Sequence, residues 1–316
     1  MRQMLEKLLL TAIFTIAAAS AQAQVAVSEM VPAAPRIIDP TEVVPTASFV
    51  TPNPAAMQWG APSRWGGGTL SSEREQTAPT TGTPVEFGGI YAGARVLGKN
   101  LTVAGYMLEL GDDTNTFSLE ADWNVLAGGV AFQSGDNITF GVSMERADNT
   151  VSGVSLDFNT INLGLSVKAS DKIYLGLALG TEDINVASES GDRSVQKYGV
   201  GYRAGGQSQT HFEAYIVDRE ANDQFSAGAF SDSNEKVLVA EVILGSIFLG
   251  ASLSNTTQDR NDQEINALIF DIGWAPKNGL ALLFHRESAT TESGVSTTSP
   301  TEDDTSTTAI SIAWSF

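Results

Sequence analysis

The sequence contains no cysteine and only two histidines among its 316 residues. Without cysteine there is no disulfide, no thiolate metal ligand and no lipid-bearing residue of the kind that anchors a lipoprotein. A secreted eukaryotic domain of this length more often uses disulfides, so a bacterial envelope protein stabilised by hydrogen bonding fits better. The composition gives no support for a transition-metal site, and we expect no cofactor.

Positive charge is scarce as well, with 18 Lys and Arg against 37 Asp and Glu and a net charge of −19. This balance argues against nucleic acid as a partner and against simple attraction to anionic lipid head groups. Beyond the N-terminus no apolar run approaches the length of a transmembrane helix. Composition alone leaves a soluble periplasmic all-β protein, or a secreted binding module, as an alternative.

Residues 1–23 have the features of a signal peptide. A weakly basic start, Met1–Lys7, precedes the apolar run Leu8–Ala19, and Ala21-Gln22-Ala23 forms a small-x-small cleavage pattern. The apolar run is short for a membrane span, which favours secretion over an N-terminal anchor. The next segment, 24–57, is rich in Pro and Ala and is expected to be extended rather than a strand or helix.

Residues 58–316 show repeated alternation of apolar with small or polar residues. At the C-terminus Ile310, Ile312, Trp314 and Phe316 share one face, and Ala and Ser occupy the other. A period of two predicts a β-strand. The same pattern recurs in segments that start at Ile138, Ile161, Ile173 and Leu268.

Short and long connections alternate along the chain. The short ones are rich in turn residues and occur near 98–100, 134–137, 169–171, 205–207, 245–246 and 276–278. The long ones are acidic and rich in Ser, Thr and Asn, and we expect them at 112–116, 147–152, 182–193, 220–234, 255–263 and 287–305. Tight turns at one end and longer loops at the other are typical of outer-membrane β-barrels.

The expected fold class is therefore all-β, a transmembrane antiparallel β-barrel. If the last strand ends at the periplasmic side, the strand near 85–97 needs a partner before it, and Trp59–Arg74 is the available segment. The total is then fourteen strands, an even number as expected. Gly66-Gly67-Gly68 makes this first strand the weakest, so twelve strands is the alternative.

The large apolar faces are expected to contact hydrocarbon rather than water. Charged residues are sparse within the strands and gather in the loops, whereas a soluble sandwich would carry them on its outer face. Closure also leaves no sheet edge unpaired in lipid. The expected location is the outer membrane of a Gram-negative bacterium, with membrane lipid as a partner.

Two resemblances to known proteins add to this interpretation. The final segment Ile310–Phe316, with Trp314 and Phe316, resembles the C-terminal signal that the barrel-assembly machinery recognises, which would make that machinery a partner. Ala47–Met57, with the motif Asn53-Pro54-Ala55, is similar to the segment before the first strand in the FadL-type family of hydrophobic-compound transporters. That resemblance implies that residues 24–57 form a plug within a fourteen-stranded barrel. As a simple alternative, Asn53-Pro54 initiates a turn and nothing more.

Alternation within the strands places a set of charged residues inside the barrel. They are Arg95, Glu109, Glu145, Lys168, Lys197, Arg203, Glu213, Glu241, Asp271 and His285. Their mixed signs suggest mutual neutralisation more than a selectivity filter. Several apolar residues are also expected to face inward, which favours a plugged or lipophilic interior: Val103, Met107, Val239, Ile243, Ile269 and Leu283.

An enzymatic function has little support, because neither His211 nor His285 stands in a pattern typical of outer-membrane hydrolases. The acidic stretch Glu302-Asp303-Asp304 lacks the ligand spacing of a calcium site. The resemblance to the FadL-type family implies passive uptake of a hydrophobic small molecule such as a fatty acid, and this is the function that we expect. The alternative is a general diffusion porin, or a structural barrel without a specific substrate.

Overall fold

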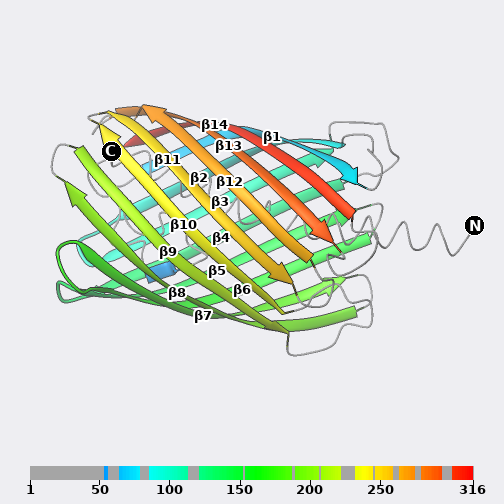
Figure 1. Cartoon of the computed structure of the whole chain (residues 1–316). Helices are drawn as coiled ribbons and strands as arrows, with labels where there is room; N and C mark the ends of the chain where they lie inside the picture. Colours follow the sequence, from blue (N-terminus) through cyan, green and yellow to red (C-terminus); the bar gives the residue numbers. More distant parts are fainter. Residues whose placement is uncertain are drawn as a thin grey trace, which may run out of the picture.

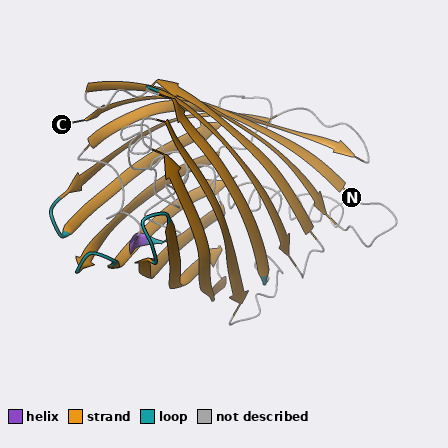
Figure 2. Ribbon diagram, turned by 60° about the vertical axis from the view of Figure 1, so that its left-hand side comes forward, coloured by secondary structure: helices purple, strands orange, loops and turns teal. Residues whose placement is uncertain are grey.

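The computed structural model describes one short N-terminal piece and most of the chain after residue 63. The described ranges are 53–55, 64–78, 85–112, 121–151, 154–186, 189–205, 208–221, 232–244, 246–258, 263–274, 279–293 and 301–315. The expected signal peptide, most of the 24–57 segment and Phe316 lie outside these ranges. Pro54 and Ala55 form a short helical turn, which Figure 2 shows in purple.

Fourteen strands form a single closed barrel (Figure 1). Each strand pairs antiparallel with its neighbours in sequence, and the last strand pairs with the first. The expected fourteen-stranded barrel is confirmed, and the twelve-stranded alternative is wrong. The strands are β1 Arg64–Ala78, β2 Val85–Leu97, β3 Leu101–Asp112, β4 Ala121–Ser134, β5 Ile138–Val151, β6 Val154–Lys168, β7 Ile173–Val186, β8 Glu189–Gly205, β9 Ser208–Ala221, β10 Ser233–Leu244, β11 Ile247–Gln258, β12 Gln263–Trp274, β13 Gly279–Ser293 and β14 Thr301–Ser315.

The structure describes the first strand, predicted over Trp59–Arg74, from Arg64 to Ala78, and this strand includes the three consecutive glycines. Residues 59–63 of the predicted strand lie outside the described ranges. A side chain at Gly66 would place its Cβ 2.8 Å from the Cβ of Ala313 on β14. A side chain at Gly68 would place its Cβ 2.6 Å from the phenol oxygen of Tyr91 on β2. These glycines therefore permit close packing where the barrel closes, which outweighs their low intrinsic preference for strands.

The two faces of the wall differ in chemistry. Large apolar side chains are exposed on the outer face in nearly every strand, for example Leu126, Leu163, Leu179, Phe270 and Ile310. Most of the side chains between them are buried on the inner face, where small, polar and charged residues occur together with some larger apolar ones. So much exposed apolar surface is unfavourable in water, because each Å² contributes about 25 cal/mol when it is removed from water. The outer face therefore fits a hydrocarbon surrounding.

The prediction of a long connection at 182–193 is wrong. β7 continues to Val186 and β8 starts at Glu189, so both strands pass through this polar stretch. Ile184 is buried, and Glu182 forms an ion pair with Arg193 on the inner face. Polar composition suggested a loop, but the charges there pair across the strands. β5 likewise continues to Val151, β11 runs on to Gln258 and β13 to Ser293, all within stretches expected to be loops.

Among the described residues, no helix is both long and apolar enough to cross a membrane.

Candidate functional site

The tripeptide Asn53-Pro54-Ala55 lies against the inner face of β5, β6 and β7. The side-chain amide nitrogen of Asn53 donates a hydrogen bond to the carbonyl oxygen of Leu165 on β6, with a length of 3.3 Å. The side-chain oxygen of Asn53 accepts a 3.1 Å hydrogen bond from the backbone N–H of Ala55, which closes a local turn. All three residues are buried. The asparagine thus fixes both the shape of the tripeptide and its attachment to the wall.

Three glycines, Gly141, Gly164 and Gly176, make room for this tripeptide, and we call them the glycine cradle. They come from β5, β6 and β7, and Gly141 pairs directly with Gly164. A Cβ at Gly141 would collide with the backbone between Pro54 and Ala55. A Cβ at Gly164 would stand 2.9 Å from the backbone nitrogen of Ala55, and one at Gly176 would stand 2.7 Å from the amide nitrogen of Asn53. Only glycine lets the segment approach the wall this closely.

Four charged residues form a chain of ion pairs on the inner wall, which we call the ionic ladder. Arg193 of β8 pairs with Glu182 of β7, and its Nε lies 3.0 Å from a carboxylate oxygen of that residue. Arg219 of β9 lies between Glu182, at 3.4 Å, and Glu235 of β10, at 3.3 Å. Such buried charges are tolerated because each has a partner. The ladder spans four neighbouring strands.

A second polar contact lies further round the wall, on β12 and β13. Asp271 of β12 and His285 of β13 are direct neighbours in the sheet and both are buried. The Nδ1 atom of His285 is 2.7 Å from a carboxylate oxygen of Asp271. In the part of the chain that the structure describes, no group of three or more His, Asp or Glu side chains could hold a metal ion.

Most charged residues that the sequence placed in the lumen lie buried on the inner wall. These are Arg95, Glu145, Lys197, Glu213, Glu241, Asp271 and His285. Lys168 is only partly buried and pairs at 3.3 Å with Asp171, beside the short connection after β6. The backbone of Arg203 is in β8, and its side chain lies outside the description. None of these positions by itself assigns a role in binding a ligand.

Glu109 is a correction to the sequence-based expectation. It is exposed and shares the outer face of β3 with Val103 and Met107, whose side chains are 47% and 55% exposed, so these two residues are corrections as well. The residue that faces inward is Leu108, which pairs with Tyr91. Because β3 carries apolar residues on both faces, alternation alone did not indicate which face was inner.

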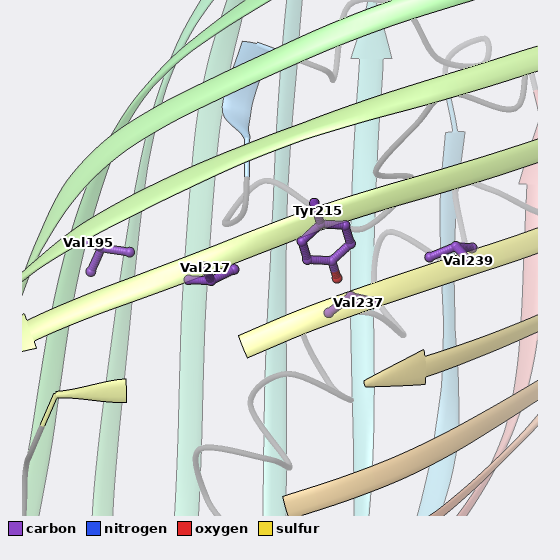
Figure 3. Packing of buried hydrophobic residues seen from close by; sticks show 5 residues of the cluster. All are labelled: Val195, Tyr215, Val217, Val237 and Val239. Carbon is purple, nitrogen blue, oxygen red and sulfur yellow. The ribbon is translucent and has the colours of Figure 1, made fainter. Parts of the chain in front are cut away.

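An apolar patch covers part of the inner wall, and its members are Val195, Tyr215, Val217, Val237 and Val239. Figure 3 shows these five side chains on the neighbouring strands β8, β9 and β10. Val239 and Ile269 are buried, in agreement with the sequence-based expectation. The side chains of Ile243 and Leu283 lie outside the description. The interior therefore offers both apolar and ionic surface.

Sequence reasoning missed three components of this site. The glycine cradle was noticed only as the small face of alternating strands. Arg193, Arg219, Glu182 and Glu235 were placed in loops or not singled out, although opposite charges repeat on neighbouring segments there. Ser143 and Asn162, which the structure buries beside the cradle, look in sequence like ordinary small polar positions.

The C-terminal strand ends with Trp314 on the outer face, where its side chain is exposed. This placement fits the alternation that the sequence predicted for β14. Phe316, the last residue of the proposed assembly signal, lies outside the described residues.

Fold and interior together define a class: a fourteen-stranded barrel with an apolar outer wall, an ionic inner wall and a chain segment seated inside. No protein-family profile matches this chain, and no curated protein sequence does. Several solved structures share its fold, and the similar structures include FadL-type channels, as the resemblance at Asn53-Pro54-Ala55 implied.

Three of these structures illustrate the likeness. The CymD monoaromatic hydrocarbon channel has a TM-score of 0.59 at 13% identity, over 88% of this chain and 99% of that one. The Ralstonia pickettii toluene transporter TbuX has a TM-score of 0.55 at 11% identity, over 84% and 92%. A Pseudomonas aeruginosa FadL homologue has a TM-score of 0.54 at 9% identity, over 88% and 96%. At these identities the likeness establishes the fold alone.

Proposed function

We propose that this protein is a channel in the outer membrane of a Gram-negative bacterium that admits hydrophobic small molecules by passive diffusion. The observation that carries the proposal is the tripeptide Asn53-Pro54-Ala55, seated in the glycine cradle inside the barrel. A segment fixed there obstructs the straight aqueous path that a diffusion porin requires. The outward apolar wall supports a position in lipid.

The residues around the tripeptide form its plug in this proposal, within the segment 24–57. Substrates would be lipophilic compounds such as fatty acids or aromatic hydrocarbons, because the apolar patch on β8–β10 provides an inner surface for them. The solved channels of similar fold, named for monoaromatic hydrocarbons and toluene, support this class of substrate. The channel performs no chemical reaction, and the C-terminal strand with Trp314 and Phe316 engages the assembly machinery.

Two measurements on the refolded protein test this proposal. In planar bilayers the full chain is expected to show little ionic conductance, and a variant that lacks residues 24–57 should conduct steadily. Liposomes that contain the full chain should take up toluene or decane-type probes faster than protein-free liposomes. Steady conductance of the full chain, unchanged by the deletion, would instead identify a general diffusion porin. Impermeability of both proteins to ions and to probes would identify a structural barrel.

A further inference from the structure

Two buried polar side chains lie on the inner wall directly beside the glycine cradle. Ser143 of β5 and Asn162 of β6 face each other in the sheet register. Their side chains are 1% and 0% exposed. Each is separated from a cradle glycine, Gly141 or Gly164, by one residue, on the side away from the short connection before β5. The pair therefore adjoins the seat of Asn53-Pro54-Ala55.

Neither side chain has a hydrogen-bond partner in the described structure. The hydroxyl of Ser143 and both the oxygen and the nitrogen of the Asn162 amide are buried and unpaired. Leaving a buried polar group unpaired costs about 1–3 kcal/mol, and native proteins pair the large majority of them. Three unpaired atoms at two adjacent positions thus favour a ligand that supplies their partners. The amide donates and accepts, so a group with both capacities matches it.

The wall next to Asn162 changes from polar to apolar within two strands. Asn162 pairs with Gly180 of β7, where a Cβ would stand 2.5 Å from the amide oxygen. Gly180 in turn pairs with Val195 of β8, the first member of the apolar patch. Two strand spacings are roughly 10 Å, about the length of an eight-carbon chain. A head group on Asn162 therefore allows a tail to lie along the patch.

The charges near this position favour a neutral head group. The acids of this region are Glu145, the next inward residue after Ser143 on β5, and Glu182 and Glu235. The basic residues Arg193, Arg219 and Lys197 match them in number. Among the described residues of this region, no positive charge is left over to compensate a carboxylate. A hydroxyl or an amide requires no such compensation.

We propose that Ser143 and Asn162 form the head-group subsite for a neutral, hydrogen-bonding amphiphile, such as a medium-chain alcohol or primary amide. The subsite holds the polar end of the molecule beside Asn53-Pro54-Ala55 while its tail contacts the apolar patch. This inference rests on the proposed function, since it names the substrate class for the same interior.

Equilibrium binding to the full chain in lipid nanodiscs tests the subsite, with empty nanodiscs as the reference for partition into lipid. The probes are 1-decanol, decanoate and decane, which share a tail and differ in the head. The wild-type protein should bind decanol more tightly than either of the others. Asn162→Leu, which keeps the size of the side chain but removes its hydrogen bonds, should weaken decanol binding on the order of tenfold and leave decane binding unchanged.

Two further variants keep the test decisive. Ser143→Ala is a milder change, and it should weaken decanol binding severalfold. This variant provides the test if Asn162→Leu does not fold. Asn266→Leu, on the exposed outer face of β12, is the matched control and should bind all three probes as the wild type does.

The proposed subsite is overturned if Asn162→Leu and Ser143→Ala bind decanol as tightly as the wild type does, which is the result expected when only water contacts these side chains. It is also overturned if decanoate is the probe that binds most tightly. Decane uptake would still support the proposed channel in that case. A protein that admits none of the probes would overturn the channel itself.

Discussion

Tyr91 on β2 and Ser311 on β14 are joined by a hydrogen bond between their hydroxyl groups, across the intervening strand β1. Both residues pair with Gly68 of β1, which lies beneath the phenol. The closure of the barrel therefore has a side-chain contact on its inner face in addition to the backbone hydrogen bonds. That contact exists only because the middle residue has no side chain.

Replacement of this glycine is expected to weaken the closure. In Gly68→Ala the new methyl group would overlap the phenol of Tyr91 and the carbonyl oxygen of Ile310. Such overpacking typically costs about 1–3 kcal/mol. The midpoint of urea unfolding in lipid vesicles should fall accordingly. Gly128→Ala is the control, because its Cβ meets only the carbonyl oxygen of Ala104 at 3.6 Å. Equal midpoints for the two variants would show that the contact does not matter.

A side chain introduced into the glycine cradle is expected to let ions pass through the barrel. Gly164→Ala should displace Asn53-Pro54-Ala55 from the wall, while the barrel itself remains folded, because the tripeptide belongs to no strand. Ionic conductance in planar bilayers is expected to rise. Gly128→Ala again serves as the control and should conduct like the wild type.

The same displacement can be followed chemically, because the natural chain has no thiol. A single Ala55→Cys substitution creates a buried reporter, which should react slowly with a maleimide. Adding Gly164→Ala should speed the reaction by about tenfold or more, the factor that a strain of at least 1.4 kcal/mol provides. Fast labelling without the glycine substitution would mean that the segment does not rest in the cradle.

Loss of a buried ion pair in the ionic ladder is expected to destabilise the barrel more than loss of an exposed ion pair. Glu182→Gln leaves Arg193 and Arg219 without their shared carboxylate and should destabilise the barrel by about 3–5 kcal/mol. Asp148→Asn breaks the exposed pair with Arg146 and should leave the unfolding midpoint nearly unchanged, because water screens this pair. Comparison of the two unfolding midpoints checks the prediction. A small effect of Glu182→Gln would show that water reaches the ladder and replaces the lost partner.

Much of the fold could be predicted from the sequence because the outer wall repeats one simple pattern. In β14 the large residues Ile310, Ile312 and Trp314 all face outward, and alternation reports this directly. The count of fourteen depended on strict alternation of two classes of connection. The predicted count was correct although β1 contains three consecutive glycines. Glycine is suitable in this strand because Tyr91 of β2 and Ala313 of β14 approach it closely. Local preference could not show that.

The interior was less predictable, for two physical reasons. In β3, Leu108 faces inward while Met107 faces outward, so both faces look apolar and Glu109 was placed on the wrong one. In β7 and β8, charges that pair across the sheet have the composition of a loop. The position of Asn53 against the wall depends on glycines that are more than eighty residues away in the sequence. A local sequence pattern cannot reveal such a contact.

The outer wall itself can be tested by placing a charge in it. Leu163→Arg, in the middle of β6 on the exposed apolar face, should destabilise the barrel in vesicles by about 2–4 kcal/mol, since a cation is costly in hydrocarbon. Asp183→Arg, exposed near the polar end of β7, should cost about 1 kcal/mol or less because the charge remains near water. If both variants unfold at the same urea concentration as the wild type, the exposed leucine face does not contact lipid. The wall would then need another apolar partner to explain its composition.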